Sequence, residues 1–126
     1  VHPAYDREFR MDRPAQLARV LSGGIVAILR APSAERLVGA ARALAEGGID
    51  VLEVTFTVPD AAEVLRDVRR ELGTQILLGA GTILDPETAR IAILAGAEFL
   101  VSPNVNVEVI RLAHRYDKLM LSGAYT

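Results

Sequence analysis

Glu53 lies within an apolar and β-branched run at residues 50–56, DVLEVTF, which otherwise predicts a buried strand. A buried carboxylate must reach water, pair with a cation or belong to a site that uses it. On an edge strand the acid would simply face solvent, whereas in a half-dry site it could give and take protons near neutral pH. Because strand side chains alternate, Glu53 shares one face with Val51 and Thr55. That face is partly polar, and the surrounding residues decide between the two interpretations.

Polar and small residues also stand at the ends of the other apolar runs. Each has an ordinary structural interpretation, as a surface cation, a tight turn or a backbone-bound hydroxyl. Together they could form a binding site in which a cation pairs with a substrate carboxylate and hydroxyl groups orient it. These strand ends carry Arg30, Thr57, Gly81, Thr82, Ser102 and Pro103. We therefore expect one site that combines these residues with Glu53.

Apolar runs predicted as strands alternate with helical patterns along the chain. The helical patterns cover residues 14–21, 33–46, 61–73 and 85–96, and another begins near residue 106. Asp85-Pro86 has the pattern of an N-cap followed by proline at the first helical position, and Asp60 and Glu63 have the spacing of a capping box. The predicted strands begin near Ile25, Asp50, Gln75, Glu98 and Lys118.

This alternation predicts a parallel sheet built from βα units, and two architectures fit it. A doubly wound sheet of this length should finish with a helix over its last strand, whereas the sequence stops at Thr126, just after a strand. A (β/α)8 TIM barrel repeats such units over ~200 residues or more. We favour the barrel, of which the chain would supply an N-terminal helix and about the first five strands, paired in sequential order. Residues 1–126 would form a single partial barrel domain.

The composition argues against several functional classes. The 126 residues are 51% hydrophobic with a net charge of −2, which is enough for one core. Cysteine is absent, and His2, in a terminus expected to be loose, and His114, in a helical pattern, suggest no metal site. Arginines are interspersed with acids, which disfavours nucleic-acid binding. Without an apolar stretch near ~20 residues or a signal-peptide layout, we expect a cytoplasmic protein without membrane contacts.

A specific resemblance is carried by segments that share the order and spacing of a known family. They are IVAILRA (25–31), GGIDVLEVTFTVPDA (47–61), GAGT (79–82) and GAEFLVSP (96–103). From about Gly24 onward the chain resembles the 2-keto-3-deoxy-6-phosphogluconate and 4-hydroxy-2-oxoglutarate aldolases. The resemblance implies a (β/α)8 barrel, usually a homotrimer, that cleaves a 2-keto-4-hydroxy acid to pyruvate and an aldehyde. Cleavage would proceed through a lysine Schiff base, without a metal or other cofactor, as in the Entner-Doudoroff pathway.

The resemblance also implies roles for individual residues. Glu53 matches the family's general acid/base, Thr82 matches a hydroxyl near the pyruvyl group, and Pro103 matches a turn that lines the site. Some members carry an arginine that grips the substrate carboxylate where this chain has Thr57. Arg30, which matches an arginine of other members, would then take its place.

The lysine implied by the resemblance stands on a sixth strand, outside these residues. The only lysine, Lys118, opens the predicted fifth strand and so lies at the wrong end of the barrel to reach a substrate. We therefore predict that the catalytic lysine lies beyond this chain and that the 126 residues alone are inactive. Two alternatives remain, a non-catalytic half-barrel fragment and a doubly wound binding module of the phosphoreceiver kind. The latter would need an aspartate where GAGT stands.

Overall fold

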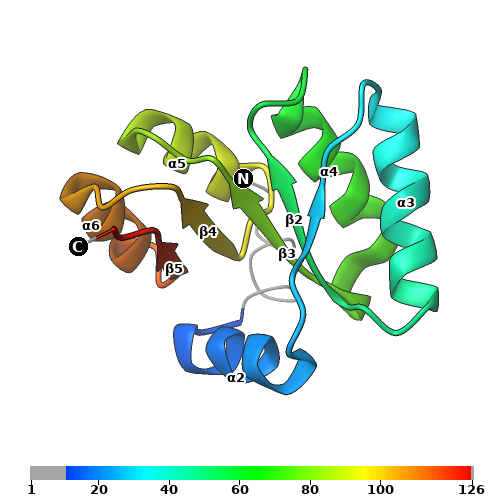
Figure 1. Ribbon diagram of the computed structural model, residues 1–126, viewed down its shortest axis with the longest axis horizontal. Coiled ribbons are helices and arrows are strands. Elements are labelled where there is room, and N and C mark those ends of the chain that lie inside the picture. The colour runs from blue at the N-terminus through cyan, green and yellow to red at the C-terminus, as the bar shows by residue number, and fades with distance from the viewer. Residues whose placement is uncertain (1–10, 126) are drawn as a thin grey trace.

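The strands form one parallel sheet in the order β1-β2-β3-β4-β5 in the computed structural model, which describes residues 11–125 (Figure 1). Every neighbouring pair is parallel. A doubly wound sheet would place the second and third strands on opposite sides of the first. That alternative is therefore wrong, and the predicted sequential order is confirmed. The strands are β1 Ala27–Leu29, β2 Val51–Thr55, β3 Leu77–Gly81, β4 Phe99–Ser102 and β5 Leu119–Ser122.

A helix follows each of the first four strands, as the alternating pattern predicted. Asp85 caps α5 as expected, because its side chain accepts a hydrogen bond from the Thr88 backbone N–H at 2.7 Å. The predicted capping box of α4 is wrong. Asp60 has φ 54° and makes no side-chain cap bond, and Glu63 pairs with Arg66 instead. The helices are α2 Arg13–Gly23, α3 Ala34–Glu46, α4 Ala61–Leu72, the 3-10 turn η1 Gly73–Gln75, α5 Pro86–Leu94 and α6 Val107–Arg115.

The main core lies between one face of the sheet and helices α3, α4, α5 and α6. Leu52 and Val54 of β2 point into it, together with Leu78 of β3 and Leu100 of β4, and all four side chains are fully buried. The helices contribute small and branched residues at helical spacing, such as Ala41 of α3. This packing leaves the opposite face of every strand to line the inside of the sheet.

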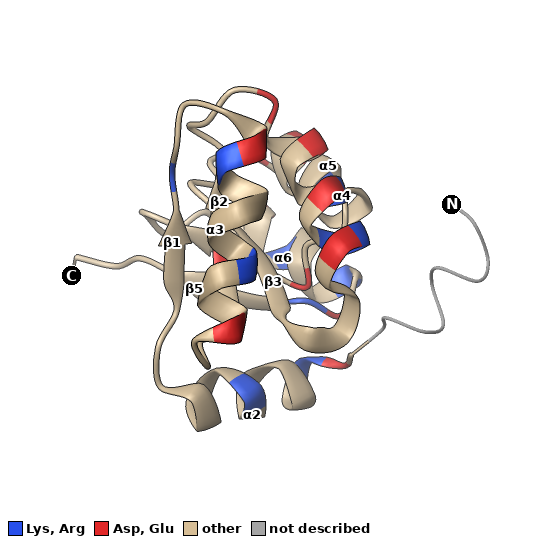
Figure 2. Ribbon diagram, turned by 90° about the vertical axis from the view of Figure 1, so that its right-hand side faces the viewer, with Lys and Arg blue, Asp and Glu red and all other residues tan. Residues whose placement is uncertain are grey.

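A smaller cluster of Val51, Leu77 and Phe99 covers that inner face. Helix α2 lies across the amino-terminal ends of the strands, below the sheet in Figure 1 and again in Figure 2. Its buried Gln16 accepts a hydrogen bond from the Leu119 backbone N–H at 2.6 Å and donates to the Asp117 carbonyl at 3.1 Å. Helix α2 therefore closes the amino-terminal end of the inner face and leaves the carboxyl-terminal end for a site.

The chain is a partial barrel, with β1 and β5 at the two edges of its sheet. Ile28, on the inner face of β1, is 63% exposed. Among the described residues no helix has the length and apolar character that crossing a membrane requires. His2 and Thr126 lie outside the described residues, and the assignment of residues 1–126 to a single domain stays a prediction.

Candidate active site

Glu53 occupies the centre of β2, which has β1 on one side and β3 on the other. It pairs in register with Ile28 and with Gly79, so its side chain belongs to the inner face. The side chain is nearly buried, with 6% of the residue exposed. The interpretation as an edge-strand acid in solvent therefore does not describe this position.

The electrostatic surroundings of Glu53 favour its protonated form. Burial raises the pKa of the Glu53 carboxyl above its ordinary value, and the nearby positive charge of Arg30 opposes this in part. Among the described residues, no group donates a hydrogen bond to this carboxylate. Arg30 follows directly after β1 and is exposed. A carboxyl of this kind can hold a proton closer to neutral pH than an ordinary glutamate and can then release it.

Gly81, at the end of β3, lies directly beneath the Glu53 side chain. A Cβ atom built on Gly81 would meet Glu53 Oε1 at 1.6 Å, so the carboxylate occupies the space that a side chain would fill. The Gly81 carbonyl accepts a hydrogen bond from the Phe56 N–H at 2.8 Å, which joins the ends of β2 and β3. The sequence placed Gly81 in the site and offered a tight turn as its ordinary explanation, whereas the contact with Glu53 was not predictable because that neighbour lies on another strand.

Hydroxyl groups lie at the same carboxyl-terminal end of the sheet. Thr82 follows Gly81 with φ 58°, a left-handed conformation that is uncommon for a β-branched residue, and it is partly exposed. Thr57 is exposed, and its Oγ1 lies 2.8 Å from Oγ1 of the buried Thr55. Thr55 lies on the same face of β2 as Glu53. The Thr57 hydroxyl is thereby anchored to the inner face of the sheet.

The turn after β4 is fixed by hydrogen bonds that converge on one carbonyl. Ser102 Oγ donates to the Asn104 carbonyl at 2.6 Å, and Ser122 Oγ donates to the same oxygen at 3.2 Å. The Gly123 N–H donates to the Ser102 carbonyl at 2.8 Å. Ser102 is buried and Pro103 is exposed. The Ser102 hydroxyl thus shapes the turn, and its contact with a substrate stays a prediction, as does that of Pro103.

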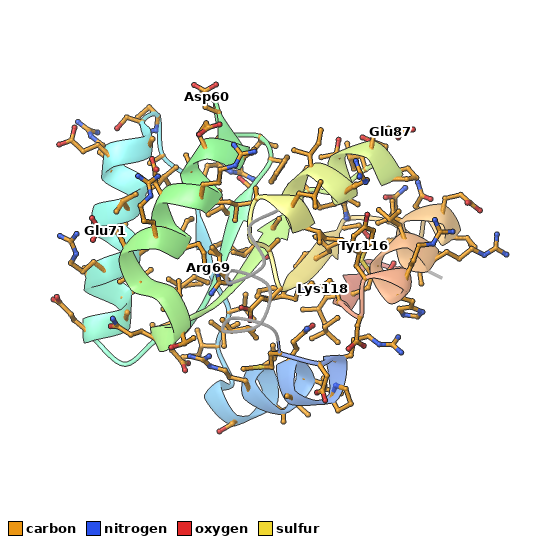
Figure 3. All side chains as sticks on the ribbon, turned by 180° about the vertical axis from the view of Figure 1, so that it is seen from behind. Asp60, Arg69, Glu71, Glu87, Tyr116 and Lys118 are labelled. Carbon is orange, nitrogen blue, oxygen red and sulfur yellow. The ribbon has the colours of Figure 1, made fainter. Side chains whose placement is uncertain are left out.

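The predicted site residues gather towards the carboxyl-terminal end of the sheet, where the first four strands finish. The Glu53 carboxylate occupies the space that a side chain on Gly81 would fill, and the charge of Arg30 acts on the same carboxylate. Lys118 precedes β5 at the opposite, amino-terminal end. It stands four positions before Ser122, and a strand rises about 3.3 Å per residue, so the two residues are separated by about 13 Å along the strand. Figure 3 shows Lys118 on the side of α2, while Asp60 and Glu87, which follow β2 and β3, lie at the far end.

A buried ion pair at the amino-terminal end was not foreseen. Arg69 Nη2 lies 2.8 Å from Glu98 Oε1, and the two side chains are only 2% and 7% exposed. Arg69 also donates to the carbonyls of Gly73 and Gly96, both at 2.9 Å. Burial raises the pKa of Glu98. The positive charge of Arg69 lowers that pKa, and the charge of Lys118 lowers it to a smaller extent. One signal was available, since Arg69 falls on the apolar stripe of α4.

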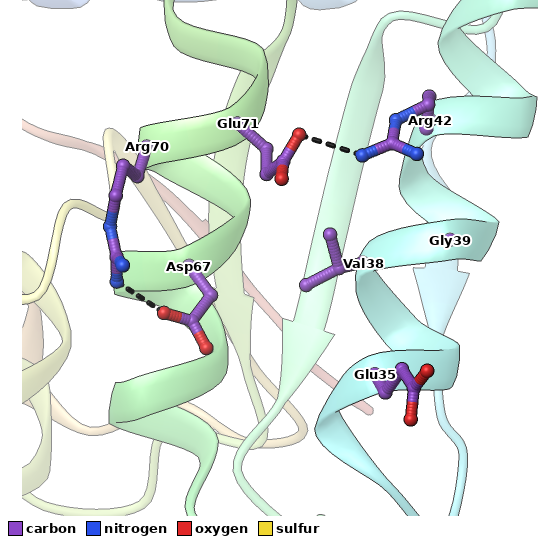
Figure 4. Close-up of a pocket in the computed structure, with 7 residues that line it drawn as sticks. All are labelled: Glu35, Val38, Gly39, Arg42, Asp67, Arg70 and Glu71. Atoms are coloured by element: carbon purple, nitrogen blue, oxygen red, sulfur yellow. Dashed lines mark hydrogen bonds and ion pairs between the residues drawn. The ribbon is translucent and has the colours of Figure 1, made fainter.

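A groove on the outer surface runs between α3 and α4, away from the strand ends (Figure 4). Four of the charged side chains that line it are paired with one another, Arg42 with Glu71 at 2.7 Å and Arg70 with Asp67. Figure 2 shows acidic and basic residues interspersed along the helices. Within residues 11–125, no group of three or more His, Cys, Asp or Glu residues could hold a metal ion. The strand-end site is therefore the better candidate for chemistry.

A sequential parallel sheet with helices on its outer face, and with a buried acid directed towards its carboxyl-terminal end, defines the chain as part of a (β/α) barrel. Residues 17–126 match the family model of the KDPG and KHG aldolases, where KDPG is 2-keto-3-deoxy-6-phosphogluconate. The chain belongs to this aldolase family, as the sequence resemblance indicated.

Curated and solved relatives agree with this assignment. A 2-dehydro-3-deoxy-phosphogluconate aldolase of Treponema pallidum is 43% identical over 86 residues, covering 68% of this chain and 40% of that protein. The 2-dehydro-3-deoxy-phosphogluconate aldolase of Pseudomonas aeruginosa is 32% identical over 123 residues, covering 98% of this chain and 53% of that protein. The crystal structure of a 4-hydroxy-2-oxoglutarate/KDPG aldolase from TTHB1 superposes with a TM-score of 0.79 at 37% identity, covering 93% and 56%. The chain spans about half the length of the relatives it matches.

Proposed function

We propose that this chain supplies half of the active site of a class I aldolase that cleaves a 2-keto-4-hydroxy acid to pyruvate and an aldehyde. The observation that carries the proposal is Glu53, a nearly buried acid whose pKa is raised by burial and whose carboxylate lies over Gly81, the last residue of β3. The family membership gives the reaction class. An aldolase of Legionella pneumophila, 29% identical with a TM-score of 0.75, was solved with pyruvate captured as a covalent carbinolamine.

The proposed chemistry needs a group that both gives and takes a proton. A lysine outside these 126 residues would attack the substrate ketone and form a carbinolamine. Glu53, protonated, would donate its proton to the carbinolamine hydroxyl, which leaves as water and gives the imine. The Glu53 carboxylate would then remove the proton of the C4 hydroxyl. The C3–C4 bond breaks, its electron pair moves into the enamine, and the aldehyde departs.

The remaining predicted residues would hold the pyruvyl part. The Arg30 guanidinium, exposed beside Glu53, would pair with the substrate carboxylate. Thr82 and Thr57 would offer hydroxyl groups to the same carboxylate or to the keto oxygen. The positive charge of Arg30 also opposes part of the rise in the pKa of Glu53 that burial causes.

Borohydride trapping tests the proposal. We define the complete-barrel form as these residues continued by the remaining strands of the barrel. With pyruvate and borohydride it should gain a stable pyruvyl adduct on a lysine and should release pyruvate from 2-keto-3-deoxy-6-phosphogluconate. The 126-residue chain, treated in the same way, should gain none. An adduct on Lys118 would refute the placement of the site, and a complete barrel that traps no pyruvate would favour a non-catalytic role.

The assembly and location are parts of the same proposal. We propose a homotrimer in the cytoplasm, acting on a small keto acid. A chain in a cage designed by fusing symmetric oligomeric domains is 30% identical to this chain with a TM-score of 0.76, which is consistent with an oligomer. Light scattering of the complete-barrel form should give three times the mass of one chain, and a monomer mass would contradict this part alone.

A further inference from the structure

The inner face of β3 carries glycine at two alternate positions. After Leu77, the next inner residues are Gly79 and Gly81. A Cβ atom on Gly79 would lie 2.3–2.5 Å from three atoms of the Phe99 ring, and one on Gly81 would lie 1.6 Å from Glu53 Oε1. These separations are far inside van der Waals contact. Side chains from both neighbouring strands therefore lie over a bare stretch of β3.

The register explains how the two side chains share this space. Glu53 of β2 and Phe99 of β4 both pair with Gly79, so the three residues form one row across the sheet. The Phe99 ring covers Gly79 in that row, whereas the Glu53 carboxylate lies over Gly81, two residues nearer the carboxyl-terminal end. Glu53 is thus directed towards the end of the sheet where the site lies.

Space, not backbone conformation, is the reason for glycine at position 81. Gly24 and Gly48 have φ of 70° and 93°, and a Cβ built on either would meet no atom within 4 Å, so glycine is favoured there by the left-handed backbone conformation. Gly81 is absent from the positive-φ residues, and the three atoms nearest to its built Cβ all belong to Glu53. An alanine could adopt the backbone conformation of Gly81, and the atoms that it would meet first belong to the Glu53 side chain.

We propose that Gly81 is a positioning residue for the acid/base Glu53, because the missing side chain lets the carboxylate lie over β3 at the mouth of the site. This inference rests on the proposed function. In Gly81→Ala the Glu53 side chain must rotate away from its place. Proton transfer needs a reach of about 2.6–3.2 Å between heavy atoms. A shift of about 1 Å can cost on the order of 10²-fold in rate.

The test uses the complete-barrel form and separates positioning from general damage. Gly81→Ala should lower kcat by about 10–10³-fold and change KM by less than about threefold, because the carboxylate-binding Arg30 is untouched. The pKa of Glu53, followed by carboxyl ¹³C NMR without substrate, should move in Gly81→Ala. Gly39→Ala is the matched control, since a Cβ on Gly39 meets nothing within 4 Å. It should leave both kcat and this pKa unchanged.

Shortening the acid should reduce the conflict. The carboxyl carbon of an aspartate stands near the place of Glu53 Cγ, which lies 3.0 Å from the built Cβ, whereas Glu53 Cδ lies at 2.5 Å. In the Glu53→Asp background, adding Gly81→Ala should therefore lower activity by less than about threefold. In the background with Glu53, the same substitution should lower it by about 10-fold or more. If Gly81→Ala fails to fold, the double variant should fold.

Several results would overturn the inference. They are an unchanged kcat and an unchanged Glu53 pKa in Gly81→Ala, equal factors of loss in the glutamate and aspartate backgrounds, or failure of both the single and the double variant to fold. If the wild type shows no aldolase activity, the proposed function fails by itself. The NMR titration and the folding comparison still decide whether Gly81 positions the carboxylate.

Discussion

Two nearly buried glutamates on opposite sides of this sheet should respond in opposite ways to the same substitution. Burial raises the pKa of both Glu53 and Glu98. Glu98 lies 2.8 Å from a guanidinium nitrogen of Arg69, whereas Glu53 accepts no hydrogen bond from the described residues. We predict that Glu53→Gln stabilises the complete-barrel form at pH 8 and that Glu98→Gln destabilises it.

The sign follows from the pKa of Glu53 in the two states. The folded pKa lies above the ordinary 4.5, so the folded state holds the proton more tightly than the unfolded state. That stability is fully present below pH 4.5 and is lost as pH rises through the folded pKa. Glutamine carries no charge to desolvate. The gain in Glu53→Gln should approach about 1.4 kcal/mol for each pH unit by which the pKa is raised.

Glu98→Gln should lower the stability of the protein, and Glu53→Gln should lower its activity. Glu98→Gln weakens a charged hydrogen bond to a buried guanidinium and should lose about 1–3 kcal/mol at pH 8. Glu53→Gln keeps the size of the side chain but cannot take up a proton, so kcat should fall by ~10²–10⁴-fold with substrate binding largely kept. The stabler variant would then be the less active one, which is the mark of a group retained for chemistry.

Urea unfolding between pH 4 and 8 measures the free energy of unfolding of both variants against the wild type. The curve of Glu53→Gln should meet that of the wild type near pH 4 and rise above it with increasing pH. A loss of stability at pH 8 would show that the Glu53 carboxylate has a stabilising partner, and a difference that does not change with pH would show that its folded pKa is not raised. Either result would refute the desolvation argument.

Three further predictions concern other residues. Arg30→Met should mainly raise KM, and adding Thr57→Arg should recover part of the loss, because both side chains lie at the same end of neighbouring strands; an unchanged KM would return Arg30 to an ordinary surface charge. Arg69→Met leaves Glu98 buried without its ion pair and should cost about 3–5 kcal/mol of unfolding free energy, part of which Glu98→Gln should restore if the pair is the cause. Hydrogen bonds from Thr88, first its backbone N–H, lower the pKa of Asp85. Asp85→Ala should therefore cost about 1 kcal/mol at pH 7, and this cost should shrink as pH falls through the folded pKa; Asp85→Asn, which keeps the cap, should cost little.

The fold was largely predictable because its signals are local. Apolar runs, helical stripes and the Asp85-Pro86 start are patterns within a few residues, and they predicted the alternation of strands and helices that the structure has. The sequential strand order follows once each helix must return the chain to a parallel strand beside the last. The capping box of α4 failed because the Asp60 backbone turned left-handed, which its spacing from Glu63 does not encode.

The sequence by itself determined which residues stand at the carboxyl-terminal ends of the strands, since strand direction and alternation are properties of the chain. The tertiary structure alone decided how their side chains are used. It buried Glu53 over Gly81, turned the Ser102 hydroxyl into its own loop, and paired Arg69 with Glu98. These outcomes depend on which side chain from a neighbouring strand or helix fills a given space, and residues far apart in sequence carry no local pattern that reports such a contact.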